Sequence, residues 1–272
     1  MQFNKKLIMC GDVIEIYEYG MTQYSGFGKS EKAKQAAQKT RELNKKDREE
    51  LQRQLKEAQG ADKEKLQRIL DAIDTETIKR RDDNLARTKK ELRRLINANA
   101  YELNKFVTLT FAENQTDVDE AHKCFRAFVK RMRRARPDFQ YICVVEFQKR
   151  GAVHYHLLSN LKYIAKNKLQ EIWKHGFVDI HRIDRVDNIG AYVVKYMNKD
   201  NHDVRLVGKK CWFASENLDK PVVETDDKKI DQIVGQLGLQ GKEIYKCEFE
   251  NEYIGKTTYM QFNLSRKDEK KS

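Results

Sequence analysis

Between residues 105 and 200 the apolar positions follow a pattern of short strands and amphipathic helices. The runs 106–111, 141–147, 152–158 and 177–183 are rich in β-branched and aromatic residues, which is typical of strands. The longer segments between them repeat apolar residues every three or four positions, which is typical of helices that bury one face. The predicted order is strand–helix–strand–strand–helix–strand–helix. This order predicts an α+β fold in which helices cover one antiparallel, ferredoxin-like or RRM-like sheet.

The helix predicted after the first of these strands has one apolar face and a basic opposite side. Its apolar positions are Phe125, Phe128, Val129 and Met132. Its arginines outside that face are Arg131, Arg133, Arg134 and Arg136. Pro137 ends the helix because proline cannot continue the backbone hydrogen bonding. We therefore expect the apolar face to pack on the sheet and the arginines to face solvent.

Residues 29–100 differ from the rest of the chain, being dense in both charges and free of proline. Gly60 divides this segment, and leucines recur at helical spacing on both sides of it. The pattern predicts an inserted antiparallel helical hairpin, more typical of a solvated charged spacer than of a DNA-binding arm. The predicted organisation is an N-terminal β-hairpin (1–28) that joins the core, this insertion (29–100), the core (101–203) and a β-rich extension with a polar tail (204–272).

Charge and cysteine usage narrow the class of protein. The chain of 272 residues carries 54 Lys and Arg against 42 Asp and Glu, a formal net charge of +12, which favours a polyanionic partner. The five cysteines are scattered without a C-x-x-C pair, so we expect a reducing, cytoplasmic setting. No apolar run is long enough for a membrane helix. The stretch "YSGFGKS" lacks the first glycine of a phosphate loop, because Gln23 occupies that position, so no nucleotide-binding site is predicted.

Two histidines and a glutamate are predicted to converge on one face of the sheet. His154 and His156 are two residues apart on a strand, so their side chains share a face. A three-residue hairpin loop at 149–151, with Gly151 in the left-handed conformation, pairs Glu146 with His154. The alternative is a half-exposed histidine pair without a ligand. A carboxylate and two imidazoles in one place favour Mg²⁺ or Mn²⁺, and they lack the thiolates of a structural zinc site.

A second group of candidate residues lies on the predicted helix 188–199, with Asp187 as its cap. Tyr192 and Tyr196 are four residues apart, so both hydroxyls leave one face of the helix. A lysine follows each tyrosine by three residues, namely Lys195 and Lys199. Ordinary amphipathic packing is the alternative. A phenol has a pKa near 10, so as a nucleophile it needs a nearby cation or metal ion.

Taken together, these motifs resemble the HUH endonuclease superfamily, in particular the rolling-circle replication initiator (Rep) proteins of plasmids and bacteriophages. The strand "FVTLTF" (106–111), the acid with the His-hydrophobic-His set, and the Y-x-x-K motifs "YVVK" and "YMNK" occur in the family's order. The resemblance covers roughly residues 105–200. It implies the HUH fold for the core.

The resemblance also implies a metal-dependent, site-specific single-strand DNA endonuclease and strand transferase. A metal ion held by Glu146, His154 and His156 would polarise the scissile phosphate, and a tyrosine would attack it to give a 5′-phosphotyrosine and a free 3′-hydroxyl. Tyr196 is favoured as nucleophile because "YMNKD" fits the single-tyrosine pattern, whereas the doublet fits two-tyrosine phage initiators. Lys195 and Lys199 would balance charge on the phosphate.

The implied partner is single-stranded origin DNA, with a host helicase and a polymerase. Phosphate contacts are expected from basic side chains: Lys149, Arg150, Arg131, Arg133 and Arg134. Base contacts are expected from Thr108 and Thr110. Within the same class, an HUH transposase or a relaxase-like nickase is an alternative, although the order of the motifs and the lysines favour a Rep protein. The alternative from another class is a non-catalytic origin-binding or RNA-binding regulator.

Overall fold

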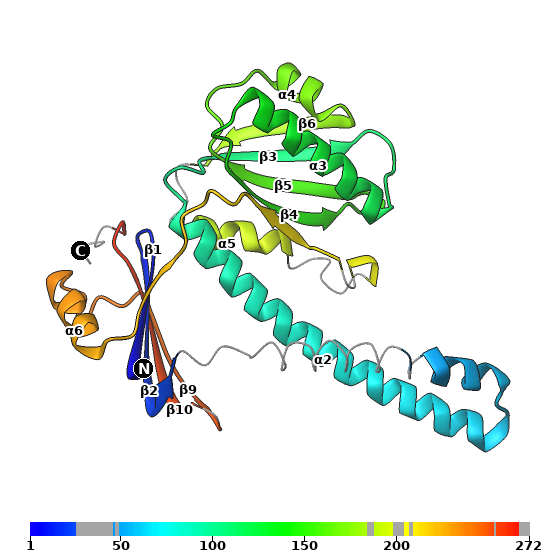
Figure 1. Cartoon of the computed structure of the whole chain (residues 1–272), viewed down its shortest axis with the longest axis horizontal. Helices are drawn as coiled ribbons and strands as arrows, with labels where there is room; N and C mark the ends of the chain where they lie inside the picture. The colour runs from blue at the N-terminus through cyan, green and yellow to red at the C-terminus, as the bar shows by residue number, and fades with distance from the viewer. Residues whose placement is uncertain are drawn as a thin grey trace, which may run out of the picture. The chain divides into compact units, whose positions relative to one another are not determined.

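The computed structural model describes residues 1–25, 46, 49–183, 188–197, 204–206, 209–252 and 254–266. These residues form two five-stranded antiparallel sheets with helices, an α+β architecture as predicted (Figure 1). The chain divides into two compact units. The smaller comprises Met1–Gln2 and Tyr24–Thr88, and the larger comprises Phe3–Gln23 and Lys89–Ser272.

The smaller unit is helical in the part that the structure describes. Residues 49–57 are helical, and the long helix α2 (Gly60–Ala98) begins where the sequence predicted a new helix. Leu70 is buried in this unit, whereas most of its described side chains are exposed. Most of the first predicted arm lies outside the described residues, so the antiparallel hairpin stays a prediction. No described helix is long and apolar enough to cross a membrane.

The first sheet of the larger unit has the strand order β6-β3-β5-β4-β7. Its strands are β3 (Lys105–Phe111), β4 (Tyr141–Phe147), β5 (Val153–Ser159), β6 (Gly176–Arg182) and β7 (Trp212–Ala214). With the helices α3 (Val118–Ala135), α4 (Lys166–Trp173) and α5 (Ile189–Val194) they follow the predicted order of elements. The 3-10 helices η1 (Lys195–Met197) and η2 (Val204–Leu206) come after α5.

The two faces of this sheet have different partners. Figure 1 shows α3 and α4 on one face and α5 on the other side. The core lies under α3 and α4, where Phe125, Phe128 and Met132 pack against strand residues such as Leu109 and Tyr155. The predicted apolar face of α3 is therefore confirmed. The face toward α5 carries the alternate strand residues, and among these are the predicted metal ligands.

The second sheet joins the two ends of the chain. Its order is β8-β1-β2-β10-β9, with β1 (Gln2–Cys10), β2 (Val13–Tyr24), β8 (Val222–Glu224), β9 (Tyr245–Asn251) and β10 (Gly255–Asn263). Helix α6 (Asp227–Gln236) packs on one face through Ile230. The N-terminal strands thus pair with C-terminal strands and not with the sheet that carries the histidines. The sequence predicted β7 and β10, but β8, α6 and β9 were missed because their apolar patterns are short.

The last turns of α2 belong to the larger unit and are part of its core. Leu92 and Ile96 are fully buried. Arg94 donates to the buried carboxylate of Glu15 on β2 at 2.6 Å. A buried ion pair of this kind is strongly destabilised when one partner is removed, because the other charge is left without compensation. The C-terminal end of α2 is therefore fixed against the second sheet.

Candidate metal and tyrosine site

The hairpin between β4 and β5 sets the positions of the metal-ligand candidates. Gln148 donates its N–H to the carbonyl of Ala152 at 2.9 Å, and Gly151 adopts φ 86°, a conformation that favours glycine. Glu146 is consequently paired with His154 across the two strands. This is the three-residue loop and the pairing that the sequence predicted.

Glu146, His154 and His156 form one cluster. Their candidate ligand atoms all lie within 4.8 Å of one another. Nε2 of His156 is 2.5 Å from Oε2 of Glu146, and the two imidazole centroids are 4.6 Å apart. His156 is buried, and the other two side chains are half-buried. The two strands thus bring a carboxylate and two imidazoles together on the sheet face toward α5.

Two threonines of β3 contact these imidazoles. The hydroxyl of Thr108 lies 3.3 Å from Nδ1 of His156, and the hydroxyl of Thr110 lies 2.6 Å from Nε2 of His154. A hydrogen bond to one ring nitrogen fixes the orientation of the ring and the position of the other nitrogen. The base contacts expected of these threonines stay a prediction. Their position assigns them first to holding the histidines.

The donor set and its protonation fit a divalent ion. Metal–ligand bonds of about 2.1 Å place ligand atoms about 3 Å apart, so small side-chain rotations bring this cluster to a metal geometry. Burial, followed by the proximity of His156, lowers the pKa of His154 to about 4. His154 is therefore neutral near pH 7, the form that binds metal ions. Mixed nitrogen and oxygen ligands suit borderline divalent ions.

The tyrosine helix begins one residue later than predicted. The side chain of Asn188 accepts a hydrogen bond from the N–H of Ala191 at 2.8 Å and caps α5, whereas Asp187 lies outside the described residues. Ile189 and Val193 are buried, as the periodicity predicted. Tyr192 is on α5, and Tyr196 follows on η1.

Both tyrosines lie at the metal cluster, and Tyr196 lies against it. The Tyr196 ring stacks on the imidazole of His156 with centroids 4.3 Å apart. The hydroxyls of Tyr192 and Tyr196 are 3.1 Å apart, within hydrogen-bond distance. The ring of Phe106 contacts both, at centroid distances of 6.0 Å to Tyr192 and 5.3 Å to Tyr196. Phe106 is part of the strand motif, but sequence reasoning did not give it this role.

The surroundings of Tyr196 keep its phenol protonated. Burial raises the pKa of Tyr196 most, and the hydrogen bond and charge of Tyr192 and the charge of Glu146 raise this pKa further. Positive charge is therefore needed before this oxygen can act as a nucleophile. The exposed Lys195 places Nζ 5.9 Å from the centroid of the Tyr192 ring. Lys199 lies outside the described residues.

The start of α5 is held by the end of α2. The N–H of Gly190 donates to Oδ1 of the buried Asn97 at 2.9 Å. A Cβ at Gly190 would lie 2.5 Å from the carbonyl oxygen of Arg93, so only glycine fits this approach. The cap residue Asn188 had a sequence signal, since asparagine directly precedes the helical pattern. Nothing in the local sequence pointed to Asn97, more than ninety residues upstream.

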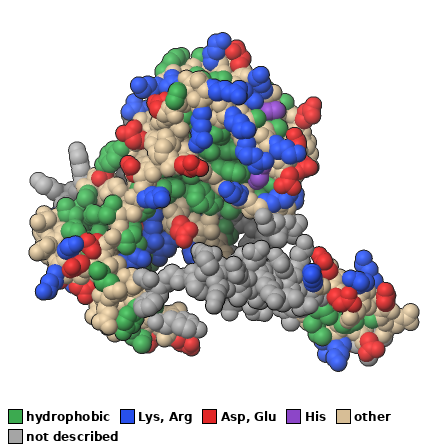
Figure 2. All heavy atoms as spheres, in the orientation of Figure 1, with side chains coloured by type: hydrophobic (Ala, Val, Ile, Leu, Met, Phe, Trp, Pro, Cys, Tyr) green, Lys and Arg blue, Asp and Glu red, His purple; other side chains and the backbone are tan. Residues whose placement is uncertain are grey.

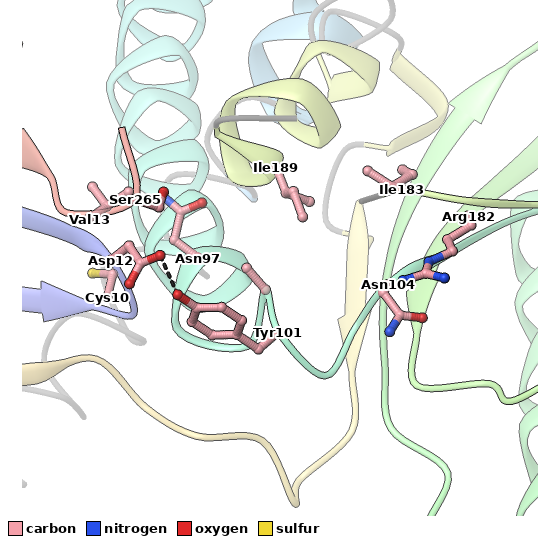
Figure 3. A pocket seen from close by; sticks show the side chains of 11 residues that line it. Cys10, Asp12, Val13, Asn97, Tyr101, Asn104, Arg182, Ile183, Ile189 and Ser265 are labelled. Carbon is pink, nitrogen blue, oxygen red and sulfur yellow. Dashed lines mark hydrogen bonds between the residues drawn. The ribbon is translucent and has the colours of Figure 1, made fainter. Parts of the chain in front are cut away.

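A cavity of about 360 Å³ lies beside this contact. Figure 3 shows Asn97, Ile189 and Arg182 around it, together with Asp12 and Tyr101, which are joined by a hydrogen bond. The metal-ligand candidates do not line this cavity. It therefore borders the base of the tyrosine helix and is separate from the cluster.

The basic residues predicted to contact phosphates fall into two groups. Arg131 donates to the carbonyls of Ile172 and Trp173 at the end of α4, and Arg150 donates to the carbonyl of Phe111 at 2.7 Å. Lys149 is exposed in the hairpin loop. Figure 2 shows Lys and Arg side chains over the face formed by α3 and α4. Those of α3 that are exposed are Lys123, Arg126, Lys130, Arg133 and Arg134.

This basic surface of α3 lies on the sheet face opposite the metal cluster. Arg133 and Arg134 are therefore not brought to the site, and Arg131 stabilises the end of α4. Phosphate contacts by all five predicted residues stay predictions. Among them, Lys149 and Arg150 are in the loop that directly follows the strand of Glu146.

Comparison with known families gives a match on this part of the chain. Residues 104–201, a little over a third of the chain, match the model of a family of replication-associated proteins, described by its member ORF2. The matched segment contains β3 to η1, and thus the metal cluster and both tyrosines. No curated protein and no solved structure matches the chain.

Proposed function

We propose that the chain is a metal-dependent, site-specific single-strand DNA endonuclease and strand transferase that initiates rolling-circle replication through a 5′-phosphotyrosine. The family match supports a role in replication. The observation that carries the chemistry is the Tyr196 ring stacked on His156 within the cluster of Glu146, His154 and His156. A nucleophile and a divalent-ion site side by side are the two parts that this reaction requires.

The residues of the cluster would hold Mg²⁺ or Mn²⁺ through one carboxylate oxygen and two imidazole nitrogens. The bound ion would act as a Lewis acid on the scissile phosphate. Thr108 and Thr110 keep the imidazoles in place, so that the cluster is pre-organised. Phe106 packs beneath both phenols and limits their movement.

In the bond-making step, the phenol oxygen of Tyr196 attacks the phosphorus. The bond from phosphorus to the 3′-oxygen breaks, the 3′-oxygen takes up a proton, and the 5′-phosphate stays on the tyrosine. The Tyr196 hydroxyl must lose its proton, and its contact with the Tyr192 hydroxyl offers a first acceptor. Attack of a 3′-hydroxyl on the phosphotyrosine reverses the step and joins strands. Tyr192 is placed to take part in this second transfer.

The reaction has a direct test. A library of single-stranded oligonucleotides with a randomised segment and a label at the 3′ end is incubated with the protein and Mn²⁺. A protein-linked labelled band that resists denaturant, is removed by protease and is absent with EDTA is the expected result. The sequences in the band define the cleavage site.

The same experiment separates the main alternative. A non-catalytic origin-binding or RNA-binding regulator retains oligonucleotides without forming a linked band under either metal ion. That outcome, with retained binding, contradicts the proposed activity.

A further inference from the structure

The second sheet carries a continuous row of aromatic rings on the face opposite α6. Phe3 contacts Tyr19 at 6.0 Å between centroids, Tyr19 stacks on Tyr17 at 6.1 Å, and Tyr17 lies 4.9 Å from Tyr259. Tyr245 continues the row at 6.0 Å from Tyr259. The row thus crosses the strands β1, β2, β10 and β9.

The strand pairing explains why these rings meet. Tyr17 and Tyr259 are directly opposite across β2 and β10, and Cys247 is opposite Tyr259 on β9. Side chains two residues apart share a face, so Tyr245 and Phe249 flank Cys247 on that face. Tyr245 is 54% exposed and Phe249 42% exposed. The row is therefore buried near its centre and open to solvent toward β9.

Cations surround the buried part of the row. Nζ of Lys90 lies 4.8 Å from the centroid of the Tyr17 ring and 5.6 Å from that of Tyr259. Burial and the nearby Arg94 lower the pKa of both Lys6 and Lys90. Glu15 is engaged by Arg94. Positive charges that repel one another at this place would be stabilised by an anionic partner.

We propose that this face is a second binding surface for single-stranded DNA, in which bases stack on the aromatic row and phosphates lie at Lys6 and Lys90. Exposed rings on an antiparallel sheet with adjacent cations are the combination that binds single strands without sequence preference. The proposal rests on the proposed function in taking single-stranded DNA as the partner. It assigns strand holding to a part of the chain outside the metal site and outside the family match.

The test measures the binding of an oligothymidylate of about 20 nucleotides, longer than one such binding site, by fluorescence anisotropy with EDTA present. The double variant Tyr245→Ala/Phe249→Ala should bind about tenfold or more weakly, since stacking contributes about 1–3 kcal/mol per base. Tyr163→Ala is the matched control, because Tyr163 is 89% exposed and outside the row, and its affinity should equal that of the wild type. Lys6→Gln and Lys90→Gln should each lower the salt slope of binding by about 0.7.

Wild-type protein gives a second measurement that does not depend on folding of the variants. Photo-crosslinking to an iododeoxyuridine oligonucleotide should label a peptide that contains Tyr245 or Phe249. Unchanged affinity of the double variant together with labelling elsewhere overturns the proposal. So does a wild-type dimer that the double variant dissociates without loss of DNA affinity, which would make the row an interface between copies. Because no metal is present, the result is independent of cleavage: binding through the row without any linked band contradicts only the proposed function.

Discussion

The phenol ring of Tyr196 lies nearly parallel to the imidazole of His156, with 4.3 Å between centroids and 28° between the ring planes. The two residues come from η1 and β5, and the stacking places the Tyr196 side chain directly against the ligand cluster, whereas the Tyr192 ring contacts Phe106 and Tyr196. Geometry thus agrees with the pattern "YMNKD" in favouring Tyr196 as the nucleophile. The Tyr192 hydroxyl lies at the same place through its contact with the Tyr196 hydroxyl.

The first prediction assigns the nucleophile. Tyr196→Phe deletes the attacking oxygen but keeps the ring that packs on His156 and Phe106, so it should abolish the protein–DNA adduct with little change in thermal unfolding. Tyr192→Phe should retain first-strand cleavage and impair joining. Adduct yield on denaturing gels and strand joining with a labelled acceptor measure the two steps.

The reverse pattern, a full adduct with Tyr196→Phe and none with Tyr192→Phe, would exchange the two roles. If each single variant cleaves and only the double variant fails, the tyrosines are interchangeable.

The second prediction concerns the ligands. His154→Ala, His156→Ala and Glu146→Ala should each weaken Mn²⁺ binding by about a hundredfold or more and abolish the adduct, because three ligands are the minimum that this cluster offers. Thr110→Val should weaken it by about tenfold, since outer hydrogen-bond partners contribute about 10- to 100-fold. Titration calorimetry with Mn²⁺ measures both.

His181→Ala is the matched control, because His181 lies half-exposed on the neighbouring edge strand and outside the cluster. Normal Mn²⁺ affinity in either histidine variant of the cluster would show that the ion binds elsewhere.

Local patterns determined the first sheet well. Each of its strands β3 to β6 has an alternating or continuous apolar pattern, and Gly151 sets the hairpin loop, so the pairing of Glu146 with His154 followed from the sequence alone. The contact of His156 with Tyr196 did not follow, because it depends on where α5 docks. That docking is set by Asn97, through a hydrogen bond that spans 93 residues of chain.

The second sheet shows the same limit. Its strands come from both ends of the chain, and neither pairing nor the aromatic row has a local signal. The end of α2 illustrates the cause: Leu92 and Ile96 continue a charged helical pattern, and only the partners on β2 and α5 make these positions part of a core. Composition had grouped them with the solvated insertion.

The third prediction concerns acid stability. His122 on α3 is buried, with Nδ1 2.9 Å from the Tyr155 hydroxyl and Nε2 3.1 Å from the carbonyl of Lys210. Burial lowers its pKa most, and of the neighbouring charges Arg126 and Lys209 lower this pKa whereas Asp119 raises it. The native state therefore holds His122 neutral, and the unfolded state binds the proton first.

The free energy of unfolding contributed by His122 is complete above the unfolded pKa of about 6.5 and is lost as the pH falls below it. His122→Phe should therefore reduce the loss of stability between about pH 7.5 and pH 5. Denaturant unfolding with EDTA measures the difference between the two proteins, since His154 contributes a similar loss to both. An equal loss in both proteins would show that His122 is not neutral in the native state.

The last prediction concerns the docking of the tyrosine helix. Gly190→Ala places a methyl group 2.5 Å from the carbonyl oxygen of Arg93 and 2.6 Å from Oδ1 of Asn97, so α5 must shift away from α2. Because Tyr192 and Tyr196 follow on the same segment, the shift should lower adduct formation by about tenfold or more while DNA binding changes little. The cost in unfolding free energy should be about 1–3 kcal/mol. Asn97→Ala should act in the same direction, since it leaves the N–H of Gly190 without its acceptor.

Gly235→Ala on α6 is the matched control for that change. Nothing lies within 4 Å of a Cβ at Gly235, so the same substitution should stabilise the helix by about 0.5–1 kcal/mol and leave adduct formation unchanged. The informative measurement is the ratio of adduct formed to DNA bound, because simple destabilisation lowers both when part of the protein unfolds. A Gly190→Ala protein in which this ratio equals that of Gly235→Ala would show that the contact between α2 and α5 supports the fold but does not position the tyrosines.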